Sequence, residues 1–199
     1  MIPYRALPAR RLEEGAGYCR PEGEGPVGPD SPALEAMTDL TRVRPVTIGP
    51  EATVPQAHQR MLAAGVRLLL VVDGAERLLG LVTAEDLLGE RPMQVASRRR
   101  VPVEEVQVAE IMTPREVLEV LDLETVRQAR VGDVVATLRR LGRQHVVVVE
   151  GGEQGPRVRG LFSATQIGRQ LGVPIHLGDM ARTFAELEAA LLPERALGA

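Results

Sequence analysis

The sequence contains no lysine, because all of its 24 basic residues are arginine. A P-loop needs a lysine on its phosphates, and a protein kinase needs a lysine on one of its strands. An enzyme that works through a Schiff base needs a lysine amine. These three classes of protein are therefore excluded.

Aromatic residues are also scarce, since they make up 2% of the chain and tryptophan is absent. Many proteins that bind single-stranded nucleic acid stack its bases on aromatic rings, and this sequence supplies few of them. The formal net charge of −3 produces no overall field that would attract nucleic acid or an anionic membrane. We therefore expect neither a nucleic acid nor a membrane as the partner.

Cys19 is the only cysteine, which rules out a disulfide within the chain and a cysteine-rich metal site. The longest apolar runs, 68–72 and 146–149, are too short to cross a bilayer. Residues 1–11 lack the apolar run of a secretory signal peptide. A free thiol suits a reducing compartment, so we expect a cytoplasmic protein.

Catalytic motifs are missing too. The sequence has no His, Cys and Glu set at metal-ligand spacing, no G-x-S-x-G motif, and no G-x-G-x-x-G motif after a predicted strand. The adjacent carboxylates Glu104 and Glu105 lie in a predicted linker, and Asp86, considered as a general base, has no second group placed to cooperate with it. We therefore expect no catalysis, no bound metal and no required cofactor.

The two ends of the chain differ in composition from the rest. Residues 1–33 are rich in Pro, Gly, Glu and Arg without apolar periodicity, which is typical of a flexible arm. Residues 176–199 place apolar residues at helical spacing from Met180 to Leu191, which predicts an amphipathic C-terminal helix.

Between the two ends the sequence repeats itself. Short words such as EAMT and GLVTAED recur later, in the same order, as EIMT and GLFSATQ. The first copies span 35–38, 51–65, 69–73 and 80–86, and the second copies span 110–113, 128–142, 146–150 and 160–166. Several words in one order indicate a duplication, which we divide into a first repeat at 34–92, a linker at 93–106 and a second repeat at 107–175.

Each repeat has the pattern of a β-α-β-β-α unit, so the predicted fold class is α+β. In the first repeat the patterns predict strands at 45–48, 68–72 and 78–82, a helix from Thr53 to about Ala64, and a helix at 84–89. In the second repeat they predict strands at 117–121, 146–149 and 158–162, and helices at 131–141 and 164–171. Gly65 and Gly142 are expected to end the long helices.

This pattern resembles the CBS domain family over about residues 34–175. The shared marks are the Met-Thr opening, the helix that ends in Gly, the V-V-D hairpin and the closing G-h-h-[ST]-x-x-[DN], where h is apolar. The second repeat departs from the family at Gln166, where Asp is usual. The resemblance implies two repeats packed with pseudo-twofold symmetry into one Bateman module, which often forms a dimer.

The resemblance also implies two clefts that bind an adenosine ligand, namely AMP, ADP, ATP or S-adenosylmethionine. For the first site it implies Val46, Thr47 and Ile48 against the adenine, with Leu81, Val82, Thr83 and Asp86. For the second site it implies Val120, Leu121, Phe162, Ser163 and Gln166. It places Arg67, Leu68, Gln144 and His145 at the phosphates, although Arg67 is equally well read as a solvated side chain and His145 is better read as a packed core residue.

The chemistry of Thr83 and Asp86 suits such a ligand. A helix N-terminus presents free N–H groups to an anion, and Thr83 stands where a predicted strand passes into a helix. Asp86 follows one turn later, and its carboxylate can accept hydrogen bonds from ribose hydroxyls. The same pair also fits a capping box, a purely structural role that is compatible with the first. Gln166 lacks the charge, so we expect the second site to be weaker, altered or empty.

We therefore predict a non-catalytic regulatory module that senses an adenosine ligand. Because no effector domain is visible in the sequence, the signal would pass to an effector protein in trans or through a homodimer. The alternative is a structural interaction scaffold whose nucleotide sites are vestigial, and the residue at position 166 favours it slightly.

Overall fold

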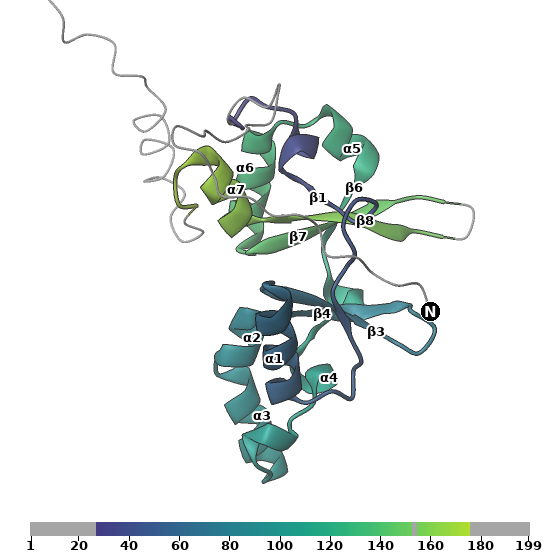
Figure 1. Cartoon of the computed structure of the whole chain (residues 1–199), viewed down its shortest axis with the longest axis vertical. Helices are drawn as coiled ribbons and strands as arrows, with labels where there is room; N and C mark the ends of the chain where they lie inside the picture. Colours follow the sequence, from purple (N-terminus) through teal and green to yellow (C-terminus); the bar gives the residue numbers. More distant parts are fainter. Residues whose placement is uncertain (1–26, 153–154, 176–199) are drawn as a thin grey trace, which may run out of the picture.

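The computed structural model describes residues 27–152 and 155–175. They form two α+β units, each with a four-stranded sheet whose helices lie on its outer side, so that the two sheets face each other across the middle of the molecule (Figure 1). The predicted fold class is confirmed. The predicted arm lies outside the described residues up to residue 26, and so does the predicted C-terminal helix.

The first unit contains β2 (Thr47–Ile48), α1 (Val54–Ala64), β3 (Leu68–Val72), β4 (Leu78–Thr83), α2 (Ala84–Leu88), α3 (Arg91–Arg99), η2 (Val103–Glu105) and α4 (Val108–Ile111). The second unit contains η3 (Arg115–Val117), β6 (Val120–Asp122), α5 (Leu123–Gln128), α6 (Val131–Leu141), β7 (His145–Glu150), β8 (Arg157–Ser163) and α7 (Ala164–Leu171). Three short elements cross between the units: η1 (Ala33–Ala36), β1 (Thr38–Asp39) and β5 (Thr113–Pro114).

The long helices begin and end where local chemistry dictates. At the start of α1 the backbone N–H of Thr53 donates to the side chain of Gln56 at 2.8 Å, and Pro55 occupies the first turn. Gly65 and Gly142 end α1 and α6 in the left-handed region, with φ of 65° and 60°, which a glycine adopts without a Cβ penalty. The predicted ends of both helices are confirmed.

Two predicted strands are shorter in the structure. The strand expected at 45–48 is reduced to Thr47–Ile48, and the one expected at 117–121 begins only at Val120. Val117 belongs instead to the 3-10 turn η3, which closes when the N–H of Leu118 donates to the carbonyl of Arg115 at 3.2 Å.

The interval 93–106, which we predicted as a linker, is largely helical. Pro92 stands in the first turn of α3, a favourable position because its missing N–H would have no helical partner there. Val95, Ala96 and Val106 are buried in the core of the first unit, so this segment is part of that unit's helical layer.

The short strands exchange between the two sheets. β1 pairs antiparallel with β8 of the second unit, and β5 pairs antiparallel with β4 of the first unit. Ala33 and Ala36, in η1, are buried in the core of the second unit. This is so although Ala33 directly precedes the first repeat and Ala36 lies at its start. The end of the predicted arm is therefore packed against the second unit at Ala33, and β1 adds Thr38 and Asp39 to the sheet of that unit.

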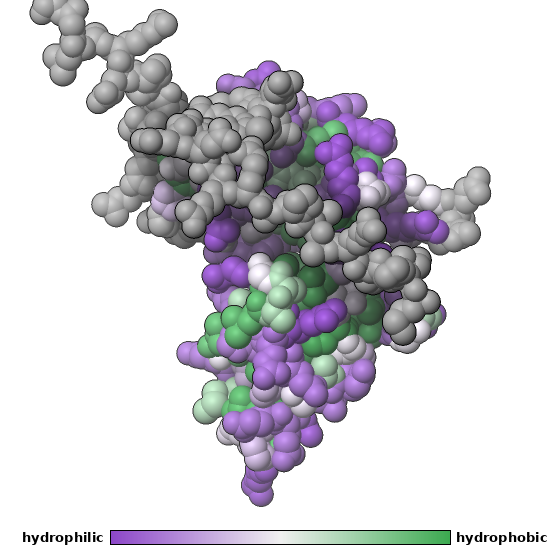
Figure 2. All heavy atoms as spheres, in the orientation of Figure 1, coloured by the Kyte–Doolittle hydropathy of each residue, from purple (hydrophilic) through white to green (hydrophobic). Residues whose placement is uncertain are grey.

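Apolar side chains hold the sheets together across the middle of the molecule. Leu68 and Leu70 of β3, Leu81 of β4 and Val147 of β7 form one buried cluster, separate from the two cores under the helices. In the view of Figure 2 hydrophobic residues gather near this junction, whereas the lower end, at α3, is hydrophilic. Within the described residues no helix is long and apolar enough to cross a membrane.

The pairing of β5 with β4 requires a glycine at position 80 of β4. A Cβ at Gly80 would lie 2.4 Å from the carbonyl oxygen of Thr113, so Gly80→Ala must push β5 away. We expect a loss of about 1–3 kcal/mol in the free energy of unfolding, the usual effect of overpacking, measured by urea denaturation. Gly74→Ala is the matched control, because a Cβ there meets no atom within 4 Å; equal losses in the two variants would contradict this account.

Candidate functional site

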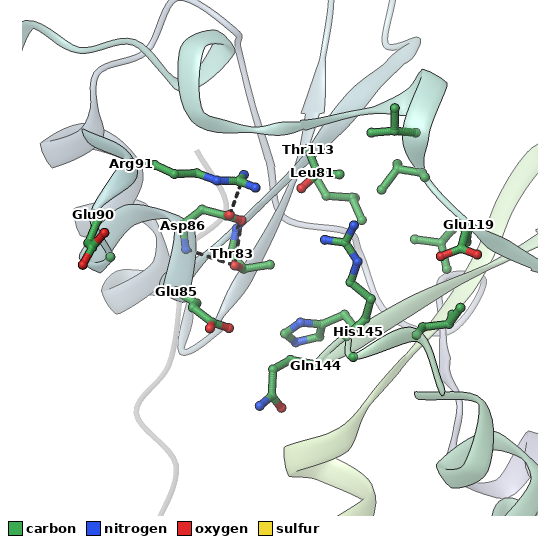
Figure 3. Close-up of a pocket in the computed structure, with 17 residues that line it drawn as sticks. Leu81, Thr83, Glu85, Asp86, Glu90, Arg91, Thr113, Glu119, Gln144 and His145 are labelled. Atoms are coloured by element: carbon green, nitrogen blue, oxygen red, sulfur yellow. Dashed lines mark hydrogen bonds and ion pairs between the residues drawn. The ribbon is translucent and has the colours of Figure 1, made fainter. Parts of the chain in front are cut away.

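A cavity of about 350 Å³, here called the Asp86 cleft, opens between the two units (Figure 3). Thr83 and Asp86 line it from the first unit, at the junction of β4 and α2. The second unit contributes the segment 117–119 before β6 and the segment 141–145 before β7. The cleft is therefore built from both repeats.

Thr83 and Asp86 form a reciprocal capping box at the start of α2. The N–H and the hydroxyl of Thr83 donate to Oδ2 of Asp86 at 2.9 and 2.7 Å, and the N–H of Asp86 donates to the Thr83 hydroxyl at 3.2 Å. Both side chains nevertheless line the cleft. The structural role and a binding role are thus compatible in this geometry.

Arg91 completes this cluster from the start of α3. Its Nη1 donates to Oδ1 of Asp86 and to the carbonyl of Ile111, both at 3.0 Å (Figure 3). The Asp86 side chain is 15% exposed and that of Arg91 is 51% exposed, so the carboxylate is sheltered and the guanidinium reaches solvent. Arg91 thereby connects the cleft to α4.

A second cavity of about 440 Å³, here called the Gln166 cleft, occupies the corresponding place on the other side. Ser163, Thr165 and Gln166 line it from the second unit, and segments 43–46 and 64–68 line it from the first. The Thr38 hydroxyl donates to Oε1 of Gln166 at 2.9 Å. The amide thus stands where Asp86 stands in the first cleft, but without a charge.

His145 lies between the two clefts. It lines both of them and also a central cavity of about 440 Å³, together with Arg67, Gln144 and Thr165. Burial, together with the nearby charge of Arg67, lowers the pKa of His145 to about 4, while the charge of Asp86 opposes this shift. The imidazole is therefore neutral at pH 7, and its Nδ1 is buried without a hydrogen-bond partner among the described residues.

The structure brings together several of the predicted site residues. Leu81, Thr83, Asp86, Gln144 and His145 line the Asp86 cleft. Val46, Arg67, Leu68, Ser163 and Gln166 line the Gln166 cleft.

The predicted pairing of these residues needs a correction. We predicted that Val46 would share a site with Asp86, because both belong to the first repeat. In the structure Val46 instead lines the Gln166 cleft, whose Gln166 belongs to the second repeat. The residues that complete the Asp86 cleft come from the second repeat and include Leu118 and Glu119. Each cleft joins the strand end of one repeat to the hydroxyl-bearing turn of the other, because the sheets face each other.

The remaining predicted contacts lie elsewhere. Val82 and Phe162 are fully buried in the helix-side cores, and Ile48 and Leu121 pack against those cores. Thr47 and Val120 line neither cleft. Successive residues of a strand point to opposite faces, and the residues in the cores are on the face away from the clefts.

Sequence reasoning missed Arg91, Thr113, Leu118 and Arg143 as residues of the Asp86 cleft. Arg91 carried a usable signal, since it follows Asp86 by five residues just after a helix. Thr113 belongs to the duplicated Met-Thr word, which we used to find the repeat but not to build a site. Among the described residues, no three His, Cys, Asp or Glu side chains are grouped closely enough to hold a metal ion.

In a comparison with known families, residues 35–92 match the model of the CBS domain. A comparison with curated protein sequences found no match.

Several solved structures share the fold, and two of the three described here are of CBS-domain proteins. A protein with CBS domains from Burkholderia ambifaria is 24% identical, with 70% of this chain and 90% of that one covered and a TM-score of 0.53. The CBS domain pair of protein MJ0100, solved with 5′-methylthioadenosine and S-adenosyl-L-methionine, is 19% identical, with coverage of 72% and 98% and a TM-score of 0.51. An uncharacterized conserved protein from Pyrococcus horikoshii is 18% identical, with coverage of 87% and 99% and a TM-score of 0.51. At these identities the likeness establishes the fold.

Proposed function

Because residues 35–92 match the CBS domain and the chain has the fold of a CBS pair, we propose that it is a non-catalytic regulatory module that binds an adenosine-containing ligand in the Asp86 cleft. The ligand would be AMP, ADP, ATP or S-adenosylmethionine. The CBS pair of MJ0100, which binds two adenosine compounds, supports this class of ligand.

The position of Asp86 carries the proposal. A carboxylate can accept about four hydrogen bonds, two on each oxygen. Oδ2 accepts two bonds from Thr83, whereas Oδ1 accepts one bond from Arg91. One acceptor position therefore remains on a sheltered charge in the cleft. A ribose hydroxyl can take it, and a second hydroxyl would have to displace Arg91.

The rest of the cleft suits a nucleoside. Leu81, Leu118 and Val147 line it with apolar surface, which can sandwich an adenine ring. The Gln166 cleft offers more apolar surface but a neutral amide in place of the carboxylate. We propose that it binds the same ligand more weakly or not at all.

Regulation would follow from the location of the cleft. A ligand there contacts both units, so it would favour one angle between them over another. A ligand can shift such an equilibrium only by its difference in affinity for the two states, and couplings of about 1–3 kcal/mol are typical. We propose that a homodimer or an effector protein in the cytoplasm reads this change.

Calorimetric titration of the purified full chain with AMP, ADP, ATP and S-adenosylmethionine tests the proposal. At a free concentration ten times the Kd, a bound ligand stabilises the native state by about 1.4 kcal/mol. For a chain of this size we expect the melting temperature to rise by about 3–6 °C. If none of the four compounds binds or raises the melting temperature, the structural scaffold becomes the better hypothesis.

A further inference from the structure

A groove of about 310 Å³ lies beside the Asp86 cleft and is lined by three arginines, Arg91, Arg98 and Arg143. We call it the arginine groove. α3 contributes Arg91 and Arg98, which are separated by two helical turns, and the turn before β7 contributes Arg143. Arg91, Thr113, Val117 and Arg143 line the cleft and the groove alike, so the two spaces adjoin.

The positive charge of the groove is compensated only in part, since Arg91 pairs with Asp86 whereas Arg98 and Arg143 have no such partner among the described residues. Glu110 is its only acidic lining residue among those described, and that carboxylate already binds Arg99 at 2.5 Å and the N–H of Gln107 at 3.0 Å. Neither Arg98 nor Arg143 forms an ion pair with a described carboxylate. Arg98 donates only a weak bond to the carbonyl of Gln94, at 3.4 Å. The guanidinium groups of Arg98 and Arg143 are thus available to an anion.

The opposite end of the Asp86 cleft is less suited to phosphate. There the cleft meets the central cavity, which carries one arginine, Arg67, and one carboxylate, Glu85. His145 adds no charge at pH 7, because burial keeps its pKa at about 4. Arginine binds phosphate oxygens through its planar fork, so two arginines without an ion-pair partner among the described residues, with Arg91 next to them, favour a polyphosphate over the single arginine of the central cavity.

We propose that the phosphate chain of the bound nucleotide lies in the arginine groove, and that the module therefore selects adenosine nucleotides with two or more phosphates. The inference rests on the proposed function, since it requires the nucleoside to occupy the Asp86 cleft. Arg91 would join the two parts of the site, because it already contacts Asp86 and also lines the groove.

Titration of the full chain with adenosine, AMP, ADP and ATP at one ionic strength tests whether the phosphate chain lies in the arginine groove or in the central cavity. We expect ATP to bind at least tenfold more tightly than AMP. Arg98→Gln, which changes a residue of the groove that does not line the cleft, should weaken ATP binding about tenfold and leave adenosine binding unchanged. Arg143→Gln should weaken ATP binding by a similar factor. Arg67→Gln is the matched control, since it removes the arginine of the central cavity, which does not line the Asp86 cleft, and it should leave the affinity of that cleft for ATP unchanged.

Failure of this inference can be distinguished from failure of the proposed function. Loss of ATP affinity in Arg67→Gln but not in Arg98→Gln would overturn the inference, because it would place the phosphates in the central cavity. Equal affinities for adenosine and ATP would overturn it as well, while leaving the proposed function in place. Absence of binding by every adenosine compound would refute the proposed function itself. Thermal denaturation of each variant is the control for folding. A melting temperature close to that of the native chain shows that a loss of affinity comes from the changed binding site and not from unfolding.

Discussion

Asp86→Ala is expected to weaken binding of adenosine compounds to the Asp86 cleft by about 10- to 150-fold. A hydrogen bond to a charged group contributes about 1.5–3 kcal/mol, and each 1.4 kcal/mol is a factor of ten in the Kd. The carboxylate is sheltered and still has one free acceptor position, so its removal deprives the ribose of this partner. Calorimetric titration of the native chain and the variant measures the change.

The same substitution removes a helix cap, which by itself costs about 0.5–2 kcal/mol of stability. Asp133→Ala is the matched control, because Asp133 caps α6 by accepting the N–H of Arg130 at 2.8 Å and does not line the Asp86 cleft. We expect similar losses of stability in both variants but a loss of affinity only at Asp86. If both variants bound equally well, Asp86 would be a cap and nothing more.

The sequence allowed most of the elements to be predicted, because their signals are local. The buried strand at 68–72 and the helices at 131–141 and 164–171 have the predicted ends. Apolar periodicity and a glycine just past the helix are properties of neighbouring residues, so one sequence suffices to detect them. Thr83 and Asp86 were found in the same way, as a cap signature at the end of a strand.

The assembly of the clefts could not be predicted, because it depends on contacts distant in sequence. β1 precedes the first repeat's long helix but pairs with β8, more than 100 residues away, as the register Thr38–Leu161 shows. No local pattern records which sheet a two-residue strand joins. The prediction therefore completed each site within its own repeat, whereas the structure completes it with the other.

Acidification from pH 6.5 to pH 4 is expected to destabilise the folded chain by about 2–3 kcal/mol through His145. Its pKa is near 6.5 in the unfolded chain and about 4 in the folded one, because burial and Arg67 disfavour the imidazolium. Between these values the unfolded state binds more protons, so the free energy of unfolding falls as the pH falls. A shift of this size corresponds to about 3 kcal/mol, somewhat less for a side chain that water partly reaches.

Urea denaturation of the native chain and of His145→Gln across this pH range isolates the contribution of His145 to the pH dependence of stability. Glutamine does not titrate, so the variant should lose about 2–3 kcal/mol less between pH 6.5 and pH 4 than the native chain does. Asp39 does not confuse the result: bonds from Thr41 and Arg159 hold its pKa at about 2, so its stabilising effect is lost below its ordinary pKa of 3.8. An identical pH dependence in both proteins would show that His145 is not the buried neutral imidazole that separates the two clefts.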